Sequence, residues 1–174
     1  MRLVETIHQK IKTVADAKKT ISAGKVLGKT FAFTNGCFDI LHPGHLYSSA
    51  ETAKEADFLI VGLNSDASVK RLKGPERPIN NTHDRALILA NLLLVDMVVI
   101  FEEDTPLELI SSLLPDVLVK GGDYTIETIV GAKEVIANGG KLFKPTILKV
   151  KDNKPTFIRN VISSETAYKL RQMS

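Results

Sequence analysis

The 174-residue chain has one cysteine, no tryptophan and few aromatic residues. Because Cys37 stands alone, no intramolecular disulfide can form, which excludes a disulfide scaffold and suits a reducing compartment. No stretch approaches the roughly 18 apolar residues of a membrane span. Charges interrupt the apolar positions of residues 1–12, unlike a signal peptide, so we expect a cytoplasmic protein.

The charge composition is close to balanced overall but uneven along the chain. The net charge of +3 is too small to predict nucleic-acid binding by itself. Residues 1–30 carry seven Lys or Arg against two acids, and residues 141–174 carry eight against two. Residues 31–140 carry eight against sixteen. The apolar and charged fractions, 44% and 25%, are those of an ordinary globular domain, and the length predicts a single one.

Short apolar runs alternate with helical patterns, which predicts an α/β fold with a Rossmann-like parallel sheet of about five strands and helices on both faces. The expected strands are 30–36, 58–64, 95–101 and 115–122, and the expected helices are 43–56, 66–74, 82–94, 105–114, 126–138 and 163–173. Apolar spacing over 3–15, extending to Ile21, predicts an amphipathic helix. We expect residues 1–29 to pack this helix on a domain of residues 30–174, and residues 144–160 to form a β-hairpin.

The segment NGCFDILHPGH, residues 35–45, carries the strongest functional pattern. It follows the first expected strand and opens a helix, with Pro43 at the helix start and Gly44 leaving room for a ligand. His42 and His45 are three residues apart, so both can face one point beside the unpaired N–H groups of the helix N-terminus. This arrangement suits a polyphosphate. A metal site and an incidental histidine pair are the alternatives, and a lone pair of histidines is thin support for a metal.

Further charged segments follow the other expected strands. In the loop 70–78, Lys70 and Lys73 can reach phosphates and Arg77 can clamp a sugar phosphate bidentately, unless the loop is merely a solvated basic surface. Arg85, within an apolar helix, is either a phosphate ligand or half of a structural ion pair. The acids of 101–104 precede a helix start, which favours a dipole role over metal binding.

Together these segments resemble known proteins. FTNGCFDILHPGH resembles the signature of nucleotidyltransferases with an HxGH motif. LNSDASVKRLKGPERPIN, FEEDTPLELI and PDVLVKGGDY resemble the adenylyltransferase part of bacterial ADP-heptose synthase, over roughly residues 30–140. The resemblance implies AMP transfer from ATP to D-glycero-D-manno-heptose 1-phosphate, with Mg²⁺ assisting and pyrophosphate leaving. Such ADP-heptose would serve lipopolysaccharide or surface-glycan synthesis.

The resemblance also implies roles for particular residues. His42, His45 and Lys70 are the expected catalytic residues. Asp39, Lys73, Arg77 and Arg85 are the expected ligands of the substrate phosphate, although a buried capping role for Asp39 is an equal alternative. The expected nucleotide-binding residues are Asn35, Gly36, Cys37, Phe38, Gly44, Lys120, Gly121, Asp123, Ser163 and Ser164. The alternative for Cys37 is that it is only a small packed residue. The alternative for the glycine pair 121–122 is a tight turn with no ligand. No protein ligand of Mg²⁺ is expected, because the phosphates hold the ion.

Two departures from the family pattern leave alternatives open. Glu165 stands where a threonine is expected, and residues 144–160 are longer and more basic than the family's connection. A cytidylyltransferase acting on another sugar or alcohol phosphate is therefore the alternative, and a non-catalytic nucleotide- or RNA-binding module is a remote one. Arg159 and the last expected helix would close over the nucleotide. The apolar stretch 85–94 predicts either deep burial or a homodimer face.

Overall fold

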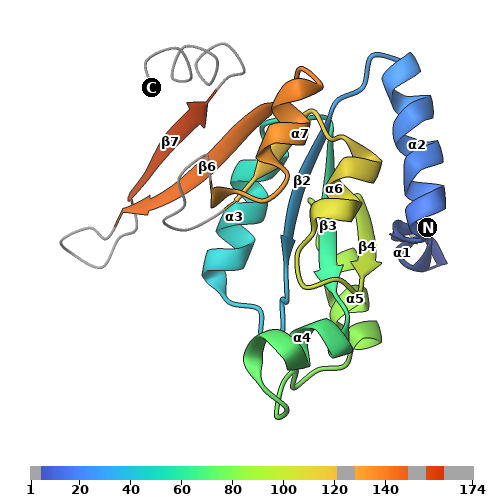
Figure 1. Cartoon of the computed structure of the whole chain (residues 1–174), viewed down its shortest axis with the longest axis vertical. Helices are drawn as coiled ribbons and strands as arrows, with labels where there is room; N and C mark the ends of the chain where they lie inside the picture. The colour runs from blue at the N-terminus through green and yellow to red at the C-terminus, as the bar shows by residue number, and fades with distance from the viewer. Residues whose placement is uncertain (1–4, 121–127, 149–155, 163–174) are drawn as a thin grey trace.

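The computed structural model describes residues 5–120, 128–148 and 156–162 (Figure 1). Its strands are β1 (Ile11–Lys12), β2 (Phe31–Gly36), β3 (Phe58–Asn64), β4 (Met97–Phe101), β5 (Val117–Val119), β6 (Lys141–Leu148) and β7 (Thr156–Ile162). Its helices are α1 (Glu5–Lys10), α2 (Val14–Val26), α3 (Pro43–Ala53), α4 (Asp66–Lys73), α5 (Thr82–Ala90), α6 (Leu107–Leu113) and α7 (Ala132–Ala137).

One sheet joins all of these strands, in the order β1-β4-β3-β2-β5-β6-β7. Neighbours are parallel except β6 and β7, so the sheet has six parallel strands and one antiparallel edge strand. The parallel α/β fold is confirmed, with one parallel strand more than expected. From β2 the chain builds outward through β3 and β4, then crosses back to place β5 on the other side of β2. The carboxyl ends of β2 and β5 therefore flank the switch point where open α/β sheets bind ligands.

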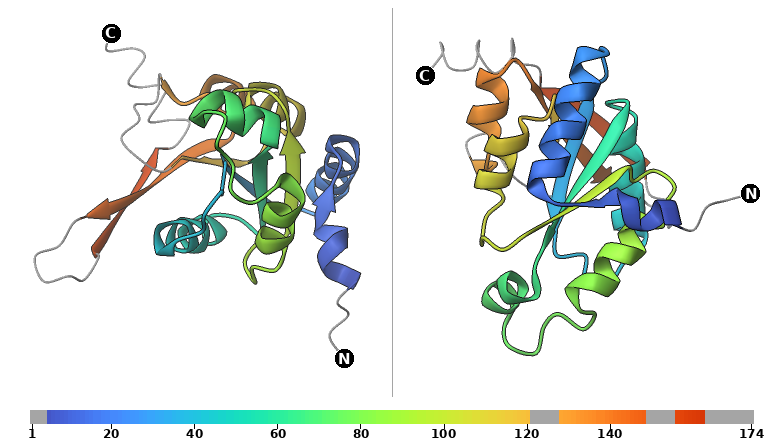
Figure 2. Two further views of the ribbon diagram at one scale, coloured as in Figure 1. Left: turned by 90° about the horizontal axis from the view of Figure 1, so that it is seen from below. Right: turned by 90° about the vertical axis from the view of Figure 1, so that its right-hand side faces the viewer.

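Helices cover both faces of the sheet (Figure 2). On one face, α2, α6 and α7 pack on a core that includes Phe31, Phe33, Ile60 and Val99. On the other face, α3 and α5 lie over alternate residues of the same strands. The strands are buried on both sides, which explains why they read as continuous apolar runs.

The N-terminal segment differs from the single helix that the apolar spacing predicts. The helical pattern divides into α1 and α2, and β1 lies between them. Ile11 and Lys12 pair in parallel with Val98 and Val99, which extends the sheet beyond β4. Backbone pairing with the open edge of β4 satisfies groups that the helix would have bonded internally, so the edge interrupts the helix. The Lys10 Nζ also donates to the Val95 carbonyl at 2.6 Å.

The C-terminal part confirms the expected hairpin. Strands β6 and β7 pair antiparallel from Leu142 with Ile162 to Leu148 with Thr156. Only the first three residues of β6 pair with β5, so the remainder forms a two-stranded ribbon that extends from the body (Figure 1). The expected turn at 152–153 and the final helix over 163–173 lie outside the described residues.

Five expected helices are shorter in the structure. α3 ends at Ala53 instead of 56, and α4 ends at Lys73 instead of 74. α5 ends at Ala90 instead of 94, and α6 begins at Leu107 instead of 105. α7 covers only Ala132–Ala137 of the expected 126–138, of which 126–127 lie outside the described residues. These differences leave the order of elements unchanged.

Candidate active site

The histidine pair lies where strand β2 gives way to helix α3. His42 is the N-cap of α3, and its Nδ1 accepts a hydrogen bond from the Gly44 amide at 3.2 Å. Pro43 occupies the first helical position, where its missing N–H costs nothing. The rings of His42 and His45 stack, with centroids 3.8 Å apart. The structure therefore brings both imidazoles together at a helix N-terminus, where unpaired N–H groups favour an anion.

His45 is the more enclosed member of the pair. Among the buried side-chain nitrogen and oxygen atoms described, its Nδ1 is the one without a hydrogen-bond partner. The Phe38 ring packs beside it, with centroids 5.2 Å apart. The pKa of His45 lies below its ordinary value, first because of burial and then because of the positive charges of His42 and Lys73. A neutral imidazole with an unused polar atom is thus ready for a ligand, and an anion beside it would raise its pKa.

A cavity of about 330 Å³ lies at the switch point of the sheet. Strand ends β2, β3 and β5 and the segments after β4 and before α7 surround it. Its lining consists of Asn35, Gly36, Cys37, Asn64, Leu72, Asp104, Thr105, Pro106, Leu118, Lys120, Thr128, Ile129 and Val130. Amide, hydroxyl and ammonium groups thus share the cavity with an apolar wall, which is the composition of a small-molecule site.

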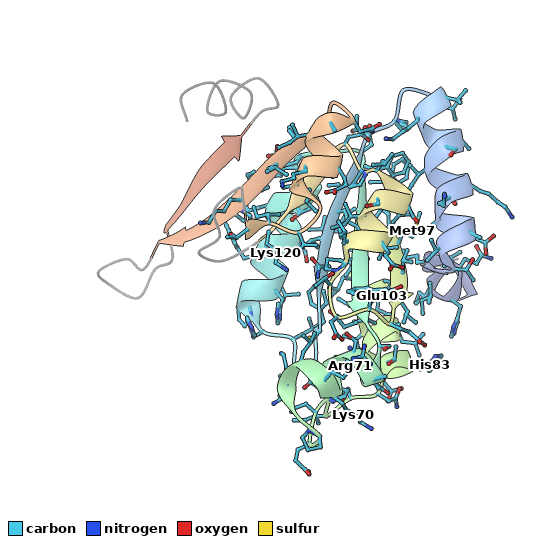
Figure 3. The ribbon with its side chains drawn as sticks, viewed as in Figure 1. Lys70, Arg71, His83, Met97, Glu103 and Lys120 are labelled. Atoms are coloured by element: carbon cyan, nitrogen blue, oxygen red, sulfur yellow. The ribbon has the colours of Figure 1, made fainter. Side chains whose placement is uncertain are left out.

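Lys120 points into the same region from the end of β5 (Figure 3). Its Nζ lies 3.4 Å from the Asn35 Oδ1. Burial lowers the pKa of Lys120, and the nearby Cys37 acts in the opposite direction. A partly buried ammonium beside an amide and at the end of a strand is well placed for an anionic or polar ligand group.

The expected nucleotide-binding residues at the end of β2 and after it lie in two places. Asn35, Gly36 and Cys37 line the cavity. Phe38 instead packs against the core on the α3 side and the His45 ring, while Gly44 lies in the first turn of α3. Cys37 is half-buried, and its Sγ lies 4.0 Å from the Asn64 Oδ1.

The basic loop brings one of its lysines near the histidines. Lys70 and Lys73 are both exposed on α4, and the charge of Lys73 acts on His45. Among the described contacts, none joins Lys70 to the histidine pair, and Figure 3 shows it at the α4 end of the molecule. Arg71 forms a surface ion pair with Asp104 and donates to the Glu102 carbonyl. This pair links α4 to the segment after β4, two parts of the cavity wall.

Asp39 occupies the buried position that the sequence left as one of two alternatives. Its side chain is 1% exposed and pairs with the Nε of Arg77. The carboxylate also accepts the amides of Ile79, at 2.7 Å, and Asn80, at 3.4 Å. Burial alone would raise the pKa of Asp39, but these donors outweigh it and the pKa lies below its ordinary value. The group is therefore an ionised anchor for residues 77–80.

Arg85 is likewise enclosed, and its guanidinium is used within the fold rather than left open to a phosphate. The residue is 1% exposed. Its guanidinium donates to the carbonyls of Cys37, Asn64 and Asn80, to the Asp66 carboxylate and to the Thr82 hydroxyl, at 2.7–3.1 Å. The ion-pair alternative is correct: Arg85 joins the ends of β2 and β3 to the segment before α5.

Four expected nucleotide-binding residues, Gly121, Asp123, Ser163 and Ser164, lie outside the described residues, as does Glu165. Sequence reasoning missed Asn64, which is buried and lines the cavity next to Cys37. Its position as the last residue of β3 was a usable signal, because polar residues at the carboxyl ends of parallel strands face the binding edge. Thr105 and Thr128 lie in connecting segments and carried no such signal.

No group of three potential metal-ligating residues occurs within the described ranges. The exposed acids at 102–104 include Asp104, which pairs with Arg71, so the ion-pair contact accounts for part of this acidic segment. Across the same part of the chain, every helix is too short or too polar to cross a membrane.

Two relatives are similar in sequence to most of this chain. The bifunctional protein HldE of Mesorhizobium japonicum is 57% identical over 128 residues, which cover 74% of this chain and 26% of that protein. HldE of Rhodospirillum rubrum is 49% identical over 148 residues, covering 80% and 30% respectively. The chain thus spans less than a third of the length of these relatives.

Solved structures agree on the fold. A lipopolysaccharide core biosynthesis protein from Thermoplasma volcanium matches with a TM-score of 0.57 and 26% identity, over 71% of this chain and all of that one. A pantoate-beta-alanine ligase from Francisella tularensis, at 14% identity and a TM-score of 0.56, covers 91% of this chain and 72% of its own. The cytidylyltransferase-like family matches residues 33–167, from the middle of β2 beyond β7. With the histidine pair and the cavity inside that range, this chain belongs to the cytidylyltransferase-like family of nucleotidyltransferases.

Proposed function

We propose that this chain transfers AMP from ATP to a heptose 1-phosphate, giving ADP-heptose and pyrophosphate for a lipopolysaccharide or surface-glycan precursor. The stacked pair of His42 and His45 at the N-terminus of α3 carries the proposal. The resemblance to ADP-heptose synthase and the identity with HldE proteins support the choice of substrates.

The chemistry requires alignment and charge stabilisation more than proton transfer. A phosphate oxygen of the sugar phosphate attacks the α-phosphorus of ATP and forms a new P–O bond. The bond from the α-phosphorus to the bridging oxygen breaks, and its electron pair leaves with pyrophosphate. Because the nucleophile is already an anion, no general base is needed. Negative charge grows on the leaving group, where preorganised donors are most effective.

The histidines suit that task. His42 is fixed as the cap of α3, and stacking holds His45 beside it. Helix N–H groups and both rings would face the triphosphate, and Lys73 adds positive charge near His45. In the cavity at the switch point, Lys120 and Asn35 would contact the nucleotide.

Mg²⁺ enters this proposal with the substrate. The described residues contain no group of three ligating side chains, and the buried carboxylate of Asp39 is committed to Arg77 and Ile79. The phosphates of ATP would therefore hold the ion and supply its charge neutralisation. We assign no protein ligand to it.

Pyrophosphate release tests the proposal. The protein is assayed with each of the four ribonucleoside triphosphates and D-glycero-D-manno-heptose 1-phosphate. Mannose 1-phosphate of the same anomeric configuration is the matched acceptor lacking one carbon. Turnover with ATP and the heptose is expected. Turnover with CTP instead would favour the cytidylyltransferase alternative, and unchanged activity in both His42→Ala and His45→Ala would refute an enzymatic role for the pair.

We also propose a cytoplasmic homodimer. Ile88, Leu93 and Leu94 are exposed at the end of α5 and just after it, and Leu93 is 91% exposed. Burying such side chains against a second copy would remove apolar area from water. Light scattering of the wild type and of a Leu93→Asp variant tests this, because a wild-type monomer would refute it.

A further inference from the structure

Arg77 is held by one edge of its guanidinium. Its Nε donates to the Oδ2 of Asp39, whose side chain is 1% exposed, whereas the arginine side chain is 35% exposed. Within residues 5–120, 128–148 and 156–162, neither Nη nitrogen of Arg77 has a hydrogen-bond acceptor. The outer edge of the guanidinium is therefore available to a ligand.

The anchoring carboxylate is itself saturated. Its Oδ1 accepts the Ile79 amide at 2.7 Å and the Asn80 amide at 3.4 Å, and the Asn80 side chain donates to the Asp39 carbonyl at 3.1 Å. Arg85 adds a second connection, from the Asn80 carbonyl to the Cys37 carbonyl. The segment 77–80 is thus fastened to the segment 37–39 at several points.

This fastening ties Arg77 to Asp39, which is close to the histidine pair in the chain. Asp39 is three residues before His42, so their Cα atoms are at most about 11 Å apart. From the same basic loop, the charge of Lys73 acts on His45. Lys73 of the loop and the helix N-terminus therefore bring positive charge to His45, and Asp39 ties Arg77 to the segment that leads into this helix.

We infer that Asp39 is a positioning residue, which orients Arg77 so that its two Nη nitrogens bind the phosphate of the acceptor. Two parallel N–H groups match two phosphate oxygens, a geometry that a lysine cannot provide. A guanidinium fixed beforehand loses less conformational freedom when the ligand binds. The identity of the acceptor in this inference rests on the proposed function. The orientation of Arg77 by Asp39 is independent of the proposed function.

Kinetics of matched variants test the inference. Asp39→Asn keeps the shape and an oxygen for the Ile79 amide but removes the charge that holds Arg77. We expect at least a 10-fold rise in KM for heptose 1-phosphate, with KM for ATP changed by less than 2-fold. Arg77→Lys should have the same signature, and the double variant should be no worse than Arg77→Lys, because Asp39 acts through Arg77.

The control is Glu55→Gln. Glu55 is also 1% exposed and pairs with a cation, Lys141, that is about one-third exposed, but it joins α3 to β6. Glu55→Gln should lower the melting temperature about as much as Asp39→Asn does. It should leave KM for ATP and KM for heptose 1-phosphate unchanged. Equal effects of Asp39→Asn on both substrates, or additive effects in the double variant, would overturn the inference.

A second measurement separates the inference from the proposed function. The Nε–H signal of Arg77 is followed by nuclear magnetic resonance while inorganic phosphate is added to protein saturated with a non-hydrolysable ATP analogue. We expect the signal to shift in the wild type and not in Asp39→Asn. If this shift is seen but heptose 1-phosphate is not turned over, only the proposed function fails. If turnover is seen but the wild-type signal does not move, only the inference fails.

Discussion

Arg85 offers the sharpest test of how this site is held together. Arg85→Met removes all five hydrogen bonds of the guanidinium while keeping an unbranched side chain of comparable length. The carbonyls of Cys37, Asn64 and Asn80 lose a charged donor, and the Asp66 carboxylate loses its partner. These acceptors come from three different segments, so the loss affects the junction between them.

The size of the effect follows from burial. Asp66 has a side chain that is 37% exposed, so water replaces part of its loss and its ion pair adds little. The penalty therefore comes mainly from the buried carbonyls. Leaving one buried acceptor unsatisfied costs about 1–3 kcal/mol, so three of them cost at least about 3 kcal/mol. For a domain of this size, about 2–4 °C per kcal/mol converts this to a fall in melting temperature of at least about 6 °C.

Calorimetry and urea unfolding of the ligand-free protein provide the assay. Arg71→Met is the matched control, because Arg71 is also an arginine with an aspartate partner but is half exposed. Its melting temperature should change by less than about 4 °C, since exposed pairs contribute at most about 1 kcal/mol. Asp66→Asn should also have a small effect. If Arg85→Met melts no lower than Arg71→Met, the buried network does not stabilise the fold as argued.

Four further predictions concern the histidine pair and the sheet. His42→Ala and His45→Ala should each lower kcat by about 10²–10³ in the pyrophosphate assay, whereas His83→Ala, at an exposed position of α5, should not change it. Because the pKa of His45 lies below the ordinary 6.5, an anionic ligand should raise it, so more of the His45 imidazole should be protonated near pH 6.5 when an ATP analogue is bound. Nuclear magnetic resonance titration of the His45 ring with and without the analogue measures this, and an unchanged or lower pKa would contradict it. Because the pKa of His45 is lower in the folded protein than in the unfolded chain, the unfolded chain binds more protons at this residue. The free energy of unfolding should therefore fall as the pH drops below about 6.5. Gly62→Ala should cost about 1–3 kcal/mol in urea unfolding, because its Cβ would lie 2.6 Å from the buried ring of Phe33; an unchanged midpoint would show that the core yields freely.

The order of elements could be predicted because each one depends on local patterns. Strand β3 is a continuous apolar run, and Pro43 marks the start of α3 two residues before His45. The histidine pair could be placed for the same reason, since a spacing of three residues at a helix start brings both rings together. The position of Asn64 as the last residue of β3 is a local signal of the same kind.

Other features depend on partners distant in the chain. The break between α1 and α2 follows from the open edge of β4, more than 80 residues away. Asp39 reads equally as ligand or anchor until Ile79 and Arg77 are placed against it. Local patterns contain no information about these contacts, so sequence reasoning could only leave the alternatives open.

The sequence by itself therefore determined the parallel α/β architecture, the family signature and the position of the histidine pair, because periodicity and short motifs act through neighbouring residues. Only the tertiary structure decided which charged side chains are enclosed in internal networks and which keep an exposed edge. Arg77 keeps a free edge while Arg85 is enclosed, although both are arginines in one short stretch of chain. The physical reason is that burial and hydrogen-bond partners decide whether a charge can meet a substrate, and both arise only when distant segments pack together.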